Sequence, residues 1–225
     1  MSFIEEIKNR AKQQIKTIIL PEATDIRILK AAQIVNKEKY AKVALIGNKE
    51  EIERLIKENN LELGDTQIID PAKSEETSEY AKELYELRKA KGMTEEQAQK
   101  LTLEPIYYGM MMVKLNHADG LVSGAAHSTA DTLRPALQIL KTAPGTKLVS
   151  AFFVMVVPNC EYGANGTFIF ADSGLNEEPD ADKLSEIAIS SSKSFKQLVG
   201  EEPKVAMLSY STYGSAHSAS TEKVI

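Results

Sequence analysis

The amino-acid sequence predicts an α/β protein with two domains, each built around a mainly parallel sheet. Short apolar runs alternate with segments of helical spacing along the 225 residues. Such alternation places successive strands parallel, with right-handed crossovers between them. Pro144 and Gly145 then separate two parts, because the apolar runs after them are longer. We therefore expect a first α/β domain over residues 1–143 and a second over residues 144–225.

The first domain is predicted to begin with an amphipathic helix, because apolar residues recur at helical spacing from Phe3 to Ile15. Apolar runs that indicate buried strands occupy residues 17–21, 42–47, 67–70 and 119–124. Helical spacing marks residues 24–35, 52–56, 75–91, 94–97, 105–115 and 133–140. Thr24 or Asp25 can cap one of these helices, Gly92 can end another, and Thr94 opens a capping box.

The second domain is predicted to contain strands at residues 148–157 and 166–171. A helix with a 3.6-residue period follows from Leu184 to Leu198, and residues 205–209 indicate a further buried strand. Residues 218–225 read as the first turns of a helix without an ending signal, so we expect the polypeptide to continue.

Composition narrows the class of protein. The net charge is −5 and the basic residues are scattered, which argues against nucleic acid as a partner. A single cysteine, Cys160, excludes an intrachain disulfide and favours a reducing, cytoplasmic setting. Acidic residues near the start argue against a signal peptide, and no apolar run reaches the ~20 residues that cross a bilayer. We expect a cytoplasmic protein with no membrane partner.

The most informative segment, residues 123–135, leaves a predicted strand and enters a predicted helix. Ligands of open α/β sheets usually bind at this edge. Gly124 allows close backbone approach, and the helix start offers free N–H groups and a positive dipole end. Ser128, Thr129 and Thr132 add hydroxyls, and Arg134 adds a planar guanidinium suited to phosphate. The pattern fits a phosphate cradle and, equally, a set of helix caps with a surface arginine.

Two further hydroxyl-rich turns follow predicted strands, at residues 172–174 and 208–215. Ser173 and Ser211 are their candidate substrate-binding residues. Serine-rich turns after strands are more often caps than catalytic groups, so neither turn is decisive alone.

Other chemistries have little support in the sequence. His127 lacks an acidic residue at a spacing that suggests a triad. No histidine pair has metal-ligand spacing, and no nucleotide-binding glycine motif is present, so we expect no metal site. Cys160 reads as a structural thiol, because nothing near it in sequence indicates activation as a nucleophile.

Six ordered motifs resemble those of the phosphate acetyltransferase and phosphate butyryltransferase family. They occupy residues 84–89, 119–127, 131–136, 159–163, 170–174 and 205–212. The resemblance covers essentially the whole chain and fits the acetyl branch better. It implies a fold like that of isocitrate and isopropylmalate dehydrogenases, with the active site in the interdomain cleft. It also implies a homodimer, coenzyme A (CoA) as a substrate and no tightly bound cofactor.

The resemblance implies reversible transfer of acetyl between CoA and phosphate, with CoA, acetyl phosphate and phosphate as the small-molecule partners. Two arginines of the family's site fall on Arg88 and Arg134. Arg134 also follows from the residue pattern, whereas Arg88 reads by pattern as a helix-surface residue. In the family, a carboxylate deprotonates the CoA thiol, and the thiolate attacks acetyl phosphate directly in a ternary complex. No acyl-enzyme is then needed, which removes Cys160 from the candidates.

The family's catalytic Ser-Arg pair and its basic Asp lie in a later motif, similar to Ser-Arg-Gly-Cys-Ser, that these residues do not contain. The missing segment also completes both domains, so both are expected to be incomplete here and the chain to be inactive alone. The alternatives are a phosphate butyryltransferase, a decarboxylating dehydrogenase of the same fold, and a non-catalytic fragment that binds CoA or acyl phosphate.

Overall fold

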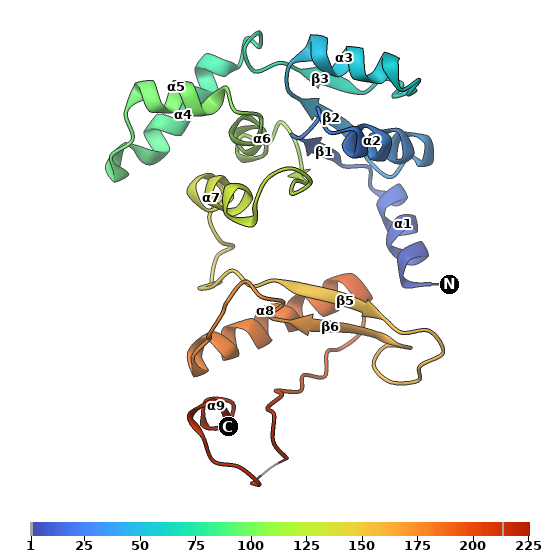
Figure 1. Cartoon of the computed structure of the whole chain (residues 1–225), viewed down its shortest axis with the longest axis vertical. Coiled ribbons are helices and arrows are strands. Elements are labelled where there is room, and N and C mark those ends of the chain that lie inside the picture. The colour runs from blue at the N-terminus through green and yellow to red at the C-terminus, as the bar shows by residue number, and fades with distance from the viewer. Residues whose placement is uncertain (1, 213) are drawn as a thin grey trace. The chain divides into compact units, whose positions relative to one another are not determined.

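The computed structural model describes residues 2–212 and 214–225 (Figure 1). They form two compact units, one of Lys8–Lys141 and one of Thr142–Ile225 with the residues before Lys8. The two are described separately below. No helix in the described part of the chain is long and apolar enough to cross a membrane.

The unit Lys8–Lys141 contains a four-stranded sheet. Its strands are β1 (Thr17–Leu20), β2 (Lys42–Ile46), β3 (Gln67–Ile69) and β4 (Gly120–Leu121). They lie in the order β3-β2-β1-β4, and each neighbouring pair is parallel. In the register Thr17 lies opposite Lys42, and Ile18 lies opposite Gly120. The parallel α/β sheet is confirmed, although β4 is shorter than predicted.

Helices connect these strands. They are α1 (Phe3–Gln13), α2 (Ile26–Glu38), α3 (Lys49–Glu58), α4 (Thr77–Arg88), α5 (Glu95–Thr102), α6 (Pro105–Lys114) and α7 (Thr129–Ile139), with a 3₁₀ turn η1 (Lys89–Lys91) after α4. Asp25 caps α2 by accepting the Arg27 N–H. Thr94 and Gln97 form both halves of the predicted capping box on α5. Gly92 ends η1 with φ +86°, a conformation that glycine adopts without strain.

Apolar side chains cover both faces of this sheet. Because successive strand residues point to opposite faces, Ile19 and Leu20 lie in different cores. The core on the Ile19 face contains buried residues of α4, α5, α6 and α7, and the core on the Leu20 face contains those of α2 and α3. Each buried Leu or Ile side chain contributes about 1.5–3 kcal/mol of transfer free energy. This two-sided burial explains the continuous apolar strands in the sequence.

Helix α6 approaches the sheet closely at Gly109. A Cβ atom there would lie 2.7 Å from Leu121 Cδ1 and 3.0 Å from Ile19 Cγ2. Real Cβ atoms essentially never lie 2.7 Å from another carbon, so a larger residue at this position would require the Leu121 side chain or α6 to shift. The contact fixes α6 against β1 and β4.

The unit that contains Thr142–Ile225 has a different sheet. Its strands, β5 (Phe152–Val156) and β6 (Thr167–Ala171), pair antiparallel, with Phe153 opposite Phe170. The prediction of a mainly parallel sheet in this part is therefore wrong, because a short connection joins the two strands as a hairpin. Helix α8 (Ala181–Val199) packs on β6, and α9 (Ala219–Glu222) is a short helix near Ile225.

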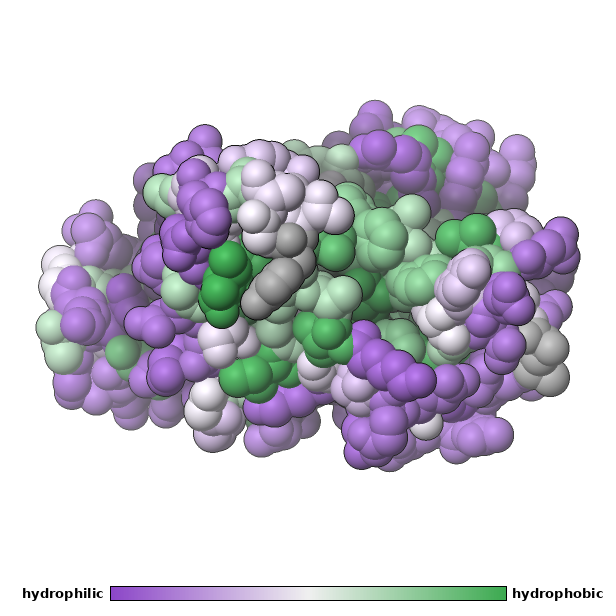
Figure 2. All heavy atoms as spheres, turned by 90° about the horizontal axis from the view of Figure 1, so that it is seen from below, coloured by the Kyte–Doolittle hydropathy of each residue, from purple (hydrophilic) through white to green (hydrophobic). Residues whose placement is uncertain are grey.

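The predicted buried strand at residues 205–209 is also wrong. These residues form no strand, and Leu208 is 84% exposed. An apolar run forms a buried strand only when a neighbouring strand pairs with it, and within the described part of this unit no strand does so. Figure 2 shows a face of the molecule with green apolar surface between purple hydrophilic regions. Large exposed apolar side chains of Thr142–Ile225 include Phe153, Phe170, Val205, Met207, Leu208, Tyr210 and Ile225.

Candidate functional site

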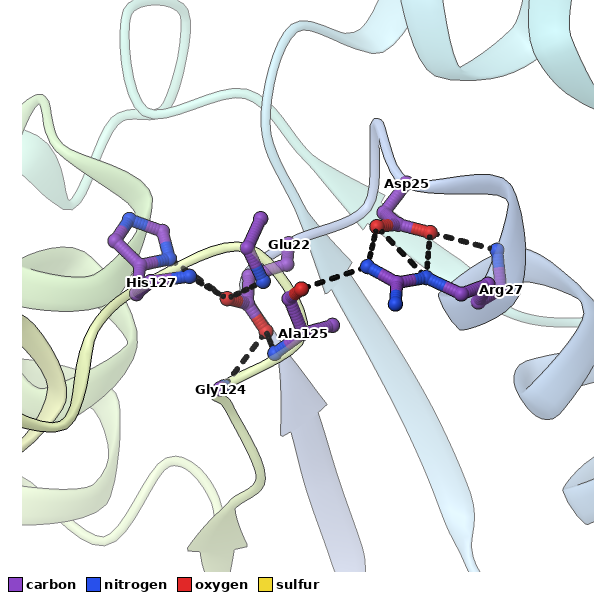
Figure 3. A network of polar contacts seen from close by, with 7 residues as sticks. Glu22, Asp25, Arg27, Gly124, Ala125 and His127 are labelled. Atoms are coloured by element: carbon purple, nitrogen blue, oxygen red, sulfur yellow. Dashed lines mark hydrogen bonds and ion pairs between the residues drawn. The ribbon is translucent and has the colours of Figure 1, made fainter.

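Two loops meet at the carboxyl ends of the adjacent strands β1 and β4. One follows β1 and contains Glu22 and Asp25, and the other runs from residue 122 to residue 128 before α7. Parallel neighbours end at the same edge of a sheet, where ligands of α/β proteins usually bind. Figure 3 shows the polar contacts that join these two loops.

The Glu22 carboxylate binds four successive backbone N–H groups of the second loop (Figure 3). Gly124 N and Ala125 N each donate to Oε2 at 2.9 Å. Ala126 N and His127 N each donate to Oε1 at 2.8 Å. The His127 ring adds a contact from Nδ1 to Oε1 at 2.8 Å. The Glu22 side chain is 1% exposed, so it is fully enclosed by this loop and its surroundings.

These contacts keep the enclosed carboxylate charged. Burial alone acts to raise the pKa of Glu22, but the N–H groups of Ala126 and Ala125 and the contacts of His127 outweigh it and lower the pKa to about 2. Residues 124–127 form the kind of N–H concavity that binds phosphate in other proteins. Here their N–H groups bind the protein's own carboxylate and are not available to a ligand.

A second contact ties the same two loops together. Arg27 Nη2 donates to the carbonyl oxygen of Ala125 at 2.6 Å. The same guanidinium group binds Asp25 through Nε and Nη2, with Nη2 to Oδ2 at 2.5 Å. The hydrogen bond from the Arg27 side chain, followed by that from the Arg27 backbone N–H, lowers the pKa of Asp25 to about 2. The two loops are thus joined by both a carboxylate and a guanidinium.

The predicted hydroxyl groups of α7 differ in their roles. Ser128 caps the helix, since its Oγ accepts from Asp131 N at 3.2 Å and donates to Asp131 Oδ2 at 2.7 Å. Thr129 is exposed in the first turn. Thr132 Oγ1 is buried and has no hydrogen-bond partner among the described residues. Of these three hydroxyls, that of Thr132 is the one that is buried without a partner among the described residues.

The charges of the two predicted arginines act on the same phenol, that of Tyr107 on α6. Burial raises the pKa of Tyr107, and the positive charges of Arg134 and Arg88 act against that rise. The Tyr107 hydroxyl donates to Gln138 Oε1 at 3.1 Å. Arg88 is half-buried, and its Nε has no hydrogen-bond partner in the described part of the chain, whereas Arg134 is exposed. A buried donor without a partner is costly and is typical of ligand sites.

The other predicted serines belong to the unit that contains Thr142–Ile225. Ser173 is half-buried and follows Asp172, whose carboxylate accepts N–H groups from Gly174 and Leu175. Ser211 Oγ donates to the carbonyl oxygen of Thr212 at 3.2 Å. Tyr213, in the same hydroxyl-rich run, lies outside the described residues. The substrate-binding roles of Ser173 and Ser211 stay predictions.

Two residues, Glu22 and Tyr107, illustrate what pattern reasoning could not see. Glu22 is the acidic partner of His127, but 105 positions separate them, so no local spacing could indicate the pair. Tyr107 reads as an apolar helix residue until the fold places it near both arginines. Across residues 2–212 and 214–225, no group of three or more His, Cys, Asp and Glu side chains is arranged to hold a metal ion.

A parallel sheet covered by helices, with two loops joined by hydrogen bonds at its carboxyl edge, defines an α/β protein whose candidate site lies at that edge. Residues 2–225 match the phosphate acetyl/butaryl transferase family. The chain belongs to this family of acyltransferases. This assignment excludes the dehydrogenase alternative.

Phosphate acetyltransferases of several bacteria match the whole chain. That of Acetivibrio thermocellus is 64% identical over 225 residues, which is 100% of this chain and 67% of the relative. That of Thermoanaerobacterium thermosaccharolyticum is 53% identical over 224 residues, 100% of this chain and 68% of the relative. These names favour the acetyl over the butyryl branch.

Solved structures agree with this assignment. The chain superposes on the EutD phosphotransacetylase from Staphylococcus aureus with a TM-score of 0.87 and 41% identity, over 99% of this chain and 65% of that one. For a phosphotransacetylase from Streptococcus pyogenes the TM-score is 0.89 and the identity is 35%, over 99% and 67% of the two chains. The chain therefore spans about two-thirds of the length of these relatives.

Proposed function

We propose that this chain supplies the phosphate-binding arginines of a phosphate acetyltransferase, and that CoA, acetyl phosphate and phosphate are its substrates. The observation that carries the proposal is the buried Nε of Arg88, which has no hydrogen-bond partner among the described residues. The positive charges of Arg88 and Arg134 both act on the Tyr107 phenol, which supports it. A pair of guanidinium groups suits the oxygens of a phosphoryl group. We also propose that the complete enzyme is a cytoplasmic homodimer.

In the proposed reaction, the thiolate sulfur of CoA forms a bond to the acetyl carbon of acetyl phosphate. The bond between that carbon and the bridging oxygen breaks, and phosphate leaves. Arg88 and Arg134 stabilise the charge that develops on the departing phosphate. The thiol proton passes first to a base and finally to phosphate, so that atoms and charge balance. By resemblance to the family, the proposed base lies in a motif outside these 225 residues, and the proposed reaction uses no tightly bound cofactor.

Several serine and threonine hydroxyls are proposed to bind the substrate as well. Thr132, whose buried hydroxyl has no partner among the described residues, is proposed to bind a substrate oxygen. Ser128 and Thr129, at the start of the same helix, and separately Ser173 and Ser211, are proposed as further substrate-binding residues. Each proposed role is a hydrogen bond to substrate.

The test of the arginine pair is phosphate binding by the 225-residue chain, measured by calorimetry. Arg88→Gln and Arg134→Gln are each expected to weaken the binding about tenfold or more, because each removes a charge-assisted hydrogen bond. Arg54→Gln is the matched control, since Arg54 is an exposed arginine of α3, beside the opposite core. Equal affinity in all four proteins would contradict the proposal.

A second assay tests catalysis with acetyl phosphate and CoA. The 225-residue chain is expected to turn over little or no substrate, whereas a chain extended to the length of its relatives should be active. Equal turnover by the two would show that the residues after Ile225 are not needed for the chemistry.

A further inference from the structure

We propose that Glu22 is a positioning residue, which fixes the start of helix α7 by binding residues 124–127 and thereby places Arg134. The proposal rests on the proposed function, because it assigns Glu22 a role through an arginine that binds phosphate. Glu22 itself is enclosed and is not expected to touch substrate.

The loop conformation depends on a carboxylate. Four successive N–H groups converge on one point, and a buried N–H without an acceptor is costly. Gly124 has φ +114°, a left-handed conformation that suits glycine and that helps to turn its neighbours' N–H groups inward. An apolar side chain of similar size at residue 22 would leave all four donors unpaired. The conformation of residues 124–127 therefore depends on the carboxylate of Glu22.

The loop continues directly into α7, so its position determines where the helix begins. His127, the last residue bound by Glu22, immediately precedes Ser128, which caps the helix. Arg134 lies six residues after Ser128, which is about 9 Å along a helix. Towards the other end of α7, Ile139 is fully buried in the core. The helix is thus held at both ends, by Glu22 through the loop and by Ile139 through packing.

An ionised carboxylate is also the form that fits this loop. All four backbone groups donate, so both carboxylate oxygens must accept, two bonds each. A glutamine at this position has the same shape, but its NH₂ group would face two N–H donors and could accept neither. Glu22→Gln therefore breaks one half of the contact without changing the size of the side chain.

The experiment compares Glu22→Gln with Asp70→Asn in the 225-residue chain. Asp70 is the matched control, because it is a buried carboxylate after β3 that accepts backbone N–H groups, those of Ala72 at 3.0 Å and Lys49 at 3.3 Å. Three quantities are measured: the midpoint of urea unfolding, the affinity for inorganic phosphate, and amide hydrogen exchange at residues 124–132.

Glu22→Gln is expected to weaken phosphate binding about tenfold and to speed exchange at residues 124–132 by a similar factor, since a lost hydrogen bond with a donor left unpaired has this effect. Asp70→Asn is expected to lower the unfolding midpoint while leaving both of these quantities unchanged. Equal phosphate affinity in wild type and Glu22→Gln, or unchanged exchange in the first turn of α7, would overturn the positioning role.

Glu22→Asp is the second variant, for use if Glu22→Gln does not fold. It keeps the charge but shortens the side chain by one methylene, so its effects on exchange should have the same sign and be smaller. If wild type itself fails to bind phosphate, the proposed function of the arginines is wrong. The exchange rates in α7 then decide by themselves whether Glu22 positions the helix.

Discussion

In each unit, one carboxylate accepts hydrogen bonds from several backbone N–H groups of a loop. The separation in sequence between the carboxylate and those N–H groups differs greatly between the two units. Glu22 follows β1 and binds N–H groups 102 to 105 residues away. Asp172 follows β6 and binds the N–H groups of Gly174, Leu175 and Asn176, two to four residues away. One carboxylate joins separate parts of a fold, whereas the other mainly shapes its own turn. A charge in a loop can thus fix long-range architecture as firmly as it fixes a local turn.

The surroundings of the two carboxylates differ as well. The unit of Glu22 has apolar cores on both faces of its sheet. The unit of Asp172 has a two-stranded hairpin on which Phe153 and Phe170, a directly opposed pair, are 60% and 57% exposed. Its free energy of folding therefore has a smaller contribution from apolar burial.

The largest expected change in the free energy of unfolding tests this difference in apolar burial. Leu45→Ala, in the fully buried centre of β2, is expected to lower the free energy of unfolding by about 2–5 kcal/mol, because it leaves a cavity. Phe170→Ala, on the exposed face of β6, should change it by less than about 1 kcal/mol. Urea unfolding of both variants checks the prediction. Similar losses would mean that the hairpin face contributes as much as the core.

The next largest expected effect is a dependence of stability on pH through the two carboxylates. Hydrogen bonds outweigh burial at both sites and hold the pKa of Glu22 and that of Asp172 at about 2, below reference values of 4.5 and 3.8. Both groups therefore stabilise the fold above pH ~4.5, and this stabilisation is lost as the pH falls towards 2. Glu22→Gln and Asp172→Asn should each cost about 1–3 kcal/mol at pH 7.

Unfolding by urea at several pH values between 7 and 3 measures this linkage. Each variant should show a smaller loss of stability on acidification than wild type, since it lacks one of the groups that must be protonated. A variant whose stability falls as steeply as that of wild type would contradict the assignment of a low pKa to that residue.

The smallest expected effect compares helix caps in the two units. Ser128→Ala removes the cap of α7, an 11-residue helix, and should cost about 1 kcal/mol. Ser218→Ala removes the cap of α9, which has four residues, and should cost less, because a short helix packed on little else contributes little to the fold. Thermal unfolding of the two variants tests this order, and a reversed order would break it.

Local signals in the sequence predicted much of the fold. The first three strands, the cap at Asp25 and the capping box at Thr94 follow from residues within a few positions of one another. The strand at residues 205–209 could not be judged in this way, because strand formation depends on a partner strand rather than on apolar content. Antiparallel pairing of β5 and β6 was missed for the same reason.

The candidate site shows the same limit. Arg134 could be predicted from its place in a strand–loop–helix segment, and Arg88 only from family resemblance. Glu22 could not be predicted as the partner of residues 124–127, because nothing near it in sequence indicates that a distant loop will present four N–H groups to it. Glu22 meets residues 124–127 because β1 and β4 are neighbours in the sheet. The order of strands in a sheet does not follow from the sequence pattern.

Gly109 of α6 packs against the strand from which the Glu22-bound loop starts. The contact of α6 with β4 is made through Leu121, the last residue of that strand, and three residues later the chain reaches Gly124, the first residue held by Glu22. A methyl group at residue 109 would have to push Leu121 away by several tenths of an ångström. Glycine at this position thus allows α6 to lie close to the last side chain of the strand from which the Glu22-bound loop starts.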